Sequence, residues 1–141
     1  MQENTTSQKK TALDKMIKCL ALVKGKKIIL VDDSLVRGWT SKTIIEACRK
    51  AAATEITCLF SFPKVISPCF YGINFTTKEE LLAVNKTDEE IAKEIGADKV
   101  GFISKEGLYR ALKKTKGICT ACFTGNYPTE LPEHLRQKVV V

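Results

Sequence analysis

Residues 31–41, VDDSLVRGWTS, place two adjacent carboxylates at the end of an apolar run, followed by a glycine-containing loop. Neighbouring acids repel each other, so Asp32 and Asp33 are expected to hold a ligand or a cation. Their oxygens can accept hydrogen bonds from two vicinal hydroxyls or lie beside Mg²⁺. Gly38 allows the backbone to approach a ligand closely. Hydroxyl groups occur in the same stretch at Ser34, Thr40 and Ser41.

The stretch leads into an expected helix that runs from about residue 41 to residue 53, with Thr40 or Ser41 as its N-cap. Free backbone N–H groups and the helix dipole at such a start favour an anion. Diol acceptors followed by a phosphate-binding loop indicate a sugar phosphate, most simply a ribose 5-phosphate.

Two other interpretations of this stretch are possible. The sequence ILVDDS is similar to the first strand of response-regulator receiver domains, where an acidic pair binds Mg²⁺. That family needs a phospho-accepting aspartate at the end of a later strand, and the only later aspartates are Asp88, in an expected helix, and Asp98, at the start of an expected strand. An ordinary strand end followed by a helix cap is the other possibility, but it explains neither the adjacent acids nor the glycine.

The chain has six cysteines, which fall into two groups. Cys19, Cys48 and Cys58 lie in apolar helix-like or strand-like stretches and are expected to pack in the core. The other three stand apart, at Cys69 in SPCFYG and at Cys119 and Cys122 in GICTACFTG.

The spacing of this second group leaves three possibilities open. Three thiolates fit an iron–sulfur cluster that lacks one ligand in this chain. A zinc site needs four ligands, and the single histidine, His134, lies among polar residues and is expected to be solvated. Free thiols are the third possibility. A thioredoxin-type redox pair is disfavoured, because Cys119-x-x-Cys122 follows the last expected helix instead of opening one after the first strands.

Apolar periodicity predicts an α/β fold in which residues 27–33 form a central strand, parallel to a strand at 55–62. The helix at 41–53 connects these two strands. The other expected elements are helices at 11–23, 76–85, 87–97 and 104–114 and a strand at 98–103. Thr87 and Glu90 have the spacing of a capping box, Ser104 is an expected N-cap, and the tail from Gly117 is expected to be irregular.

The composition is that of one soluble folded domain, 1–141, with residues 1–9 expected to be disordered. No membrane span or signal peptide is expected, which favours a cytoplasmic location. The net charge of +7 comes from scattered lysines without interleaved aromatics, so a small anionic substrate is favoured over nucleic acid.

Four stretches together resemble the C-terminal part of the glutamine phosphoribosylpyrophosphate amidotransferases. They are KKIILVDDSLVRGWTS, SPCFYGI, IGADKVGFISKEGL and CTACFTGNYP, which occur in the family's order over roughly residues 11–133. The resemblance implies a partial type I phosphoribosyltransferase fold, a parallel sheet with flanking helices, followed by an irregular C-terminal segment that carries cysteines.

The resemblance also implies roles for individual residues. Asp32 and Asp33 would hold the ribose hydroxyls of phosphoribosylpyrophosphate (PRPP) and accompany Mg²⁺. The rest of the PRPP site would comprise Ser34, Arg37, Gly38, Thr40 and Ser41, around the 5-phosphate. The cysteines Cys69, Cys119 and Cys122 would be three ligands of a [4Fe–4S] cluster, whose fourth ligand is not in this chain.

In the implied reaction, a glycosyl transfer, ammonia from glutamine displaces pyrophosphate from PRPP to give 5-phosphoribosylamine, the first step of de novo purine synthesis. The glutaminase domain has no counterpart here, so a missing glutaminase half or further copies of the chain are expected partners, with purine nucleotides as inhibitors. No catalytic residue is assigned, and the isolated chain is expected to bind weakly. Trp39 stands where the family has a small hydroxyl residue. A non-catalytic module that senses PRPP or a nucleotide is the alternative.

Overall fold

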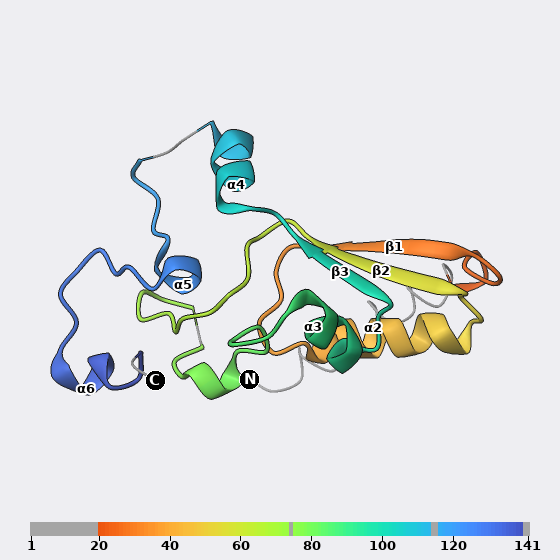
Figure 1. Cartoon of the computed structure of the whole chain (residues 1–141), viewed down its shortest axis with the longest axis horizontal. Coiled ribbons are helices and arrows are strands. Elements are labelled where there is room, and N and C mark those ends of the chain that lie inside the picture. The colour runs from red at the N-terminus through yellow and green to blue at the C-terminus, as the bar shows by residue number, and fades with distance from the viewer. Residues whose placement is uncertain (1–19, 74, 114–115, 140–141) are drawn as a thin grey trace, which may run out of the picture.

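A computed structural model of the chain describes residues 20–73, 75–113 and 116–139 (Figure 1). The segment 1–9 and nearly all of the helix predicted at 11–23 lie outside these residues, as does Cys19.

Three parallel strands form the sheet: β1 (Lys27–Asp32), β2 (Glu55–Phe60) and β3 (Lys99–Phe102). The strand order is β1-β2-β3, so β2 is the middle strand of the described sheet. The prediction that residues 27–33 form the central strand was therefore wrong. Apolar character marked β1 correctly as a sheet strand, but it could not show how many neighbours the strand has.

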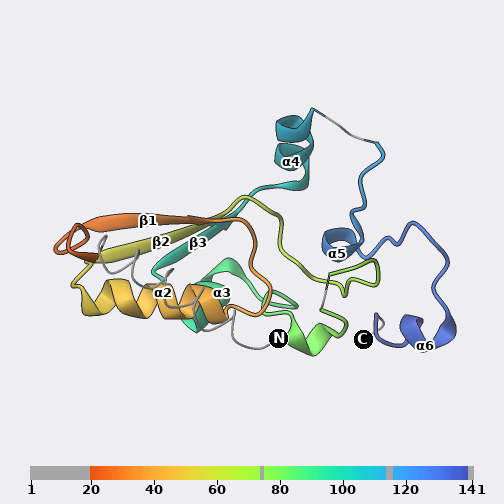
Figure 2. The same cartoon turned by 180° about the vertical axis from the view of Figure 1, so that it is seen from behind.

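Two helices, α2 (Trp39–Lys50) and α3 (Asp88–Ile95), cover one face of this sheet (Figures 1 and 2). The buried side chains between these helices and the sheet form the main core. Its most buried members are Leu35, Ile45, Ile56, Ile91 and Ile95, each at most 2% exposed. Leu35 belongs to the loop between β1 and α2, so the core extends directly beneath that loop.

The opposite face of the sheet carries no helix among the described residues (Figure 1). Side chains alternate along a strand, and the outward residues of β1 and β2 include Ile29, Val31 and Leu59, at 63%, 74% and 40% exposure. An apolar run like β1 is typical of a strand covered on both faces. In the described chain only one face of β1 is covered.

The predicted starts of two helices are confirmed. Thr87 Oγ1 accepts the Glu90 N–H while the Glu90 carboxylate accepts the Thr87 N–H, which completes the capping box of α3. Ser104 Oγ accepts the Gly107 N–H at the start of α4 (Lys105–Leu112). The helix predicted at 76–85 is instead a single 3₁₀ turn, η1 (Lys78–Glu80), followed by turns.

Beyond α4 the chain moves away from the sheet and forms two one-turn helices, α5 (Ala121–Thr124) and α6 (Glu133–Arg136) (Figure 2). The tail was predicted to be irregular, so these two helical turns are where the structure differs from the prediction. A second small core of Val65, Phe75 and Leu81 lies beneath this region, with Cys69 and Cys122 packed against it. No helix in the described part of the chain is long and apolar enough to cross a membrane.

Candidate functional site

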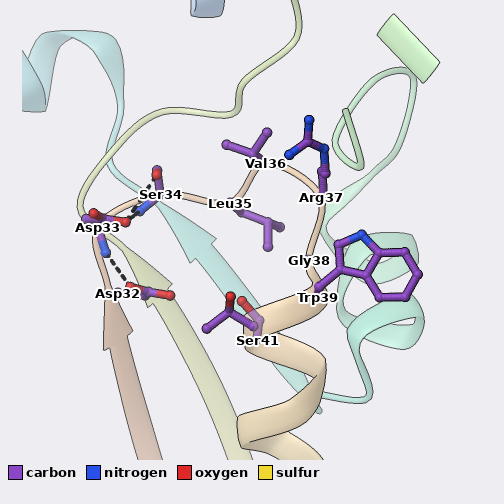
Figure 3. A pocket seen from close by; sticks show the side chains of 10 residues that line it. Asp32, Asp33, Ser34, Leu35, Val36, Arg37, Gly38, Trp39 and Ser41 are labelled. Atoms are coloured by element: carbon purple, nitrogen blue, oxygen red, sulfur yellow. Dashed lines mark hydrogen bonds between the residues drawn. The ribbon is translucent and has the colours of Figure 1, made fainter. Parts of the chain in front are cut away.

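The loop that follows β1 encloses a cavity of about 400 Å³ (Figure 3). Its lining is one continuous stretch of chain, Asp32 to Ser41. The cavity therefore lies between the carboxyl end of a parallel strand and the amino end of a helix, which is where open α/β sheets bind ligands. The site residues predicted between 32 and 41 are all brought together here.

Both carboxylates at the strand end are shaped by local hydrogen bonds. Asp32 Oδ1 accepts the Asp33 N–H at 2.9 Å, and Asp33 Oδ1 accepts the Ser34 N–H at 2.5 Å and its hydroxyl at 3.1 Å. The backbone beneath them is tied to β2, because the Ser61 N–H donates to Asp32 O at 3.0 Å. The acid pair is therefore held at the cavity wall by the sheet, with Asp33 exposed and Asp32 half-buried.

The helix α2 begins two residues earlier than predicted. Its N-cap is Gly38, at φ 76°, and no side chain caps it, so the prediction of Thr40 or Ser41 as the cap was wrong. The left-handed conformation of Gly38 turns the chain into the helix at Trp39, and the first helical bond runs from the Lys42 N–H to Gly38 O. The N–H groups of residues 39–41 precede that bond and have no partner within the helix.

The charges around this helix start suit an anion. The first turn of α2 contains no acidic residue, so no carboxylate side chain competes there for its N–H groups. Ser41 is buried at the cavity wall, whereas Trp39 is 74% exposed at its rim. The Arg37 guanidinium, also predicted to contact a ligand, forms an ion pair with Glu80.

The three candidate metal-binding cysteines lie in residues 65–73 and 116–127, here called the cysteine region. Cys69 and Cys122 pack against the same small core, and Cys119 is exposed. Burial, with a smaller effect of the neighbouring Cys69 and Cys119, raises the pKa of Cys122 to about 11. Cys69 and Cys122 thus share one small core, and the Cys122 thiol is protonated at neutral pH.

An aromatic side chain, Tyr127, packs against the residues on either side of Cys69. Tyr127 stacks on Phe70 with ring centroids 5.4 Å apart, and its hydroxyl donates to Pro68 O at 2.8 Å. Burial raises the pKa of Tyr127 to about 12.

Across residues 20–73, 75–113 and 116–139, however, no three or more His, Cys, Asp or Glu side chains are arranged to hold a metal ion. The cysteines as placed do not form a finished cluster site.

The remaining cysteine predictions are confirmed where the structure describes them. Cys48 and Cys58 are buried in the main core. Burial raises the pKa of both thiols, to about 11 for Cys58. His134 is exposed on α6, as predicted.

Sequence reasoning missed the residues that support the loop from outside. Leu82 lies beneath Gly38, Glu80 pairs with Arg37, and Ser61 ties the acid pair to β2. These residues are 29 to 44 positions distant from their partners, and no local spacing connects them.

Comparison with known proteins gives a consistent result. No protein-family model matches the chain. It is 52% identical over 111 residues to the amidophosphoribosyltransferase of Methanocaldococcus jannaschii, and 48% identical over 115 residues to that of Bacillus subtilis. These matches cover 79% and 78% of the chain. The chain is homologous to part of an amidophosphoribosyltransferase.

Solved amidophosphoribosyltransferases have the same fold. The B. subtilis glutamine PRPP amidotransferase complexed with ADP and GMP matches 81% of the chain with a TM-score of 0.74 and 46% identity. A structure described as the allosteric regulatory enzyme of purine biosynthesis matches 86% of it with the same TM-score. The α/β class and the resemblance drawn from the four stretches are confirmed. The chain spans about a quarter of the length of these relatives, 23% and 24% for the two sequences.

Proposed function

We propose that this chain is the C-terminal part of the phosphoribosyltransferase half of an amidophosphoribosyltransferase, and that its loop binds the ribose 5-phosphate portion of PRPP. The observation that carries the proposal is the cavity lined by the unbroken stretch from Asp32 to Ser41. It combines an acid pair at one end with an uncapped helix start at the other. Homology over about four fifths of the chain supports the same reading.

The proposed chemistry depends on orientation. Displacement of pyrophosphate at C1 passes through an oxocarbenium-like state, which requires a fixed ribose and charge neutralisation more than a strong base. Asp32 and Asp33 would accept hydrogen bonds from the two ribose hydroxyls, while the N–H groups of residues 39–41 and the Ser41 hydroxyl would bind the 5-phosphate. These contacts would fix both ends of the ribose.

The acid pair also suits Mg²⁺. Magnesium is bound through one or two carboxylates together with substrate oxygens, and Asp32 and Asp33 supply that donor set. When bound, the ion would neutralise charge on the pyrophosphate leaving group.

The direct test is binding of ribose 5-phosphate to the full chain by calorimetry. We expect a Kd of about 1 mM, weak because the chain spans about a quarter of its relatives. Replacing both acids, Asp32→Asn and Asp33→Asn, should abolish binding. Glu106→Gln, an exposed carboxylate on α4, is the matched control and should leave binding unchanged. A wild-type chain that shows no heat of binding would refute the proposed site.

The activity proposed for the whole protein is formation of 5-phosphoribosylamine in the cytoplasm, with purine nucleotides as regulators. Supporting this, one matched structure was determined with ADP and GMP bound. We expect the chain alone to release no pyrophosphate from PRPP, Mg²⁺ and ammonia, because catalysis needs contacts realised only in the transition state and this chain spans about a quarter of its relatives' length. The sensing-module alternative has no observation of its own in its favour.

The cluster assignment of Cys69, Cys119 and Cys122 stays a prediction of the resemblance. The described side chains would have to move to ligate a [4Fe–4S] cluster, and its fourth ligand would come from outside the chain. Anaerobic addition of iron and sulfide should give a brown protein, and Cys122→Ala should lose the colour while Cys48→Ala keeps it. Equal colour in both variants would show that these thiols are not ligands.

A further inference from the structure

The outer side of the loop is held by a segment that does not line the cavity. The Arg37 side chain leaves the loop on the side away from Asp32 and Ser41 (Figure 3). Its Nε donates to Glu80 Oε2 at 2.8 Å, and its Nη2 bonds to the same oxygen. The two side chains are 43% and 29% exposed, so this is a partly shielded pair at the surface.

The Glu80 carboxylate is itself held by a second hydrogen bond. Thr77 Oγ1 donates to Glu80 Oε1 at 3.1 Å, so each carboxylate oxygen has a partner. The Arg37 guanidinium, together with the Thr77 hydroxyl, holds the pKa of Glu80 below its usual range, so the carboxylate is ionised at neutral pH. A carboxylate held on both oxygens is a defined anchor for the two arginine N–H groups that share Oε2.

Two further contacts join the same segments. The Leu82 N–H donates to Val36 O at 2.8 Å, and a methyl group at position 38 would collide with the Leu82 side chain. Residues 36, 37 and 38 are thus each held by residue 80 or 82. These are the residues that turn the chain into α2 and so determine the direction of the N–H groups at 39–41.

Resting on the proposed function, we infer that Glu80 is a positioning residue of this site. With Arg37 it fixes the turn that aims the helix N–H groups at the anion, and it neutralises Arg37, so that the guanidinium supports the loop instead of contacting the phosphate. This differs from the role that the family resemblance implies for Arg37.

The experiment compares Arg37→Gln, Glu80→Gln and the double variant in the full chain. We expect each single variant to weaken ribose 5-phosphate binding about three- to five-fold, the range of a well-formed surface ion pair, and the double variant to be no weaker than either. Backbone amides at 35–41 should exchange faster in all three. The affinity should depend on ionic strength as in the wild type. Glu79→Gln, the exposed neighbour on η1, is the control and should change nothing.

A phosphate-binding Arg37 gives the opposite result and would overturn the inference. Glu80→Gln would then strengthen binding, and Arg37→Gln would reduce the dependence of affinity on salt. Amide exchange at residues 35–41 can be measured without a ligand, so it tests the contact between Arg37 and Glu80 even if the wild type fails to bind ribose 5-phosphate. Unchanged exchange in Glu80→Gln would also overturn the inference. Thr77→Val, which removes only one bond to Glu80, should show the same exchange effect at smaller size.

Discussion

The loop from β1 to α2 and the segment from α4 to α6 are supported in different ways. The loop is fastened to the main core by the buried Leu35, to β2 through Ser61, and to η1 through Glu80. In the segment from α4 to α6, α4 and α6 bury no side chain and α5 buries only Ala121. The loop thus rests on a core beneath it, whereas the segment from α4 to α6 has fewer buried contacts and is expected to gain order if Cys119 and Cys122 bind a metal.

The largest expected effect distinguishes the sheet core from α4. Ile56 in β2 is fully buried, so Ile56→Ala should lower the free energy of unfolding by about 2–5 kcal/mol. Leu112 at the end of α4 is 48% exposed, and Leu112→Ala should cost less than about 0.5 kcal/mol. Urea denaturation measures both. Equal losses would mean that α4 is as firmly packed as the sheet.

Two glycines of similar conformation provide a finer comparison. Gly38 and Gly117 have φ values of 76° and 74°, but an added methyl collides with Leu82 only at position 38. Gly117→Ala should cost about 1–2 kcal/mol from the left-handed conformation alone. Gly38→Ala should cost about 1–3 kcal/mol more and weaken ribose 5-phosphate binding. If the two variants have the same melting temperature, the contact with Leu82 does not hold the loop.

The pH dependence of stability should reflect a carboxylate in the sheet region. Asp98 Oδ2 accepts the Ile56 N–H and an Arg49 N–H, both at 2.6 Å, and these bonds lower the pKa of Asp98. Its contribution is therefore complete above the unfolded pKa of about 3.9 and is lost as the pH falls through the lower folded value. Thermal melts from pH 6 to pH 2 should show this loss, and Asp98→Asn should flatten it. A wild-type profile with no decline below pH 4 would contradict the assignment.

The smallest effect compares two helix caps. Thr87 caps α3, which packs three buried side chains, so Thr87→Ala should lower the free energy of unfolding by about 1 kcal/mol. Ser104 caps α4, which buries none, so Ser104→Ala should change local amide exchange in α4 but not the global transition. A global loss from Ser104→Ala as large as that from Thr87→Ala would show that α4 unfolds with the sheet.

The features predicted correctly from the sequence are those that depend on residues close together in the chain. The apolar run before Asp32, the Thr87–Glu90 spacing and Ser104 each act within a few residues, and each predicted its element correctly. Two of the failures were non-local. Whether β1 is central depends on which strands pair with it, and the start of α2 depends on Gly38 lying against Leu82. The tie between Arg37 and Glu80 spans 43 residues and has no local signal.

The central claim is that residues 32–41 bind a ribose 5-phosphate. Amide chemical shifts of the labelled full chain, recorded while ribose 5-phosphate is added, test it most directly. The amides of Asp33, Ser34 and residues 37–41 should shift together with one saturation curve, and those of the cysteine region should stay in place. Shifts confined to residues 117–127, or none at all up to concentrations well above 1 mM, would contradict the claim.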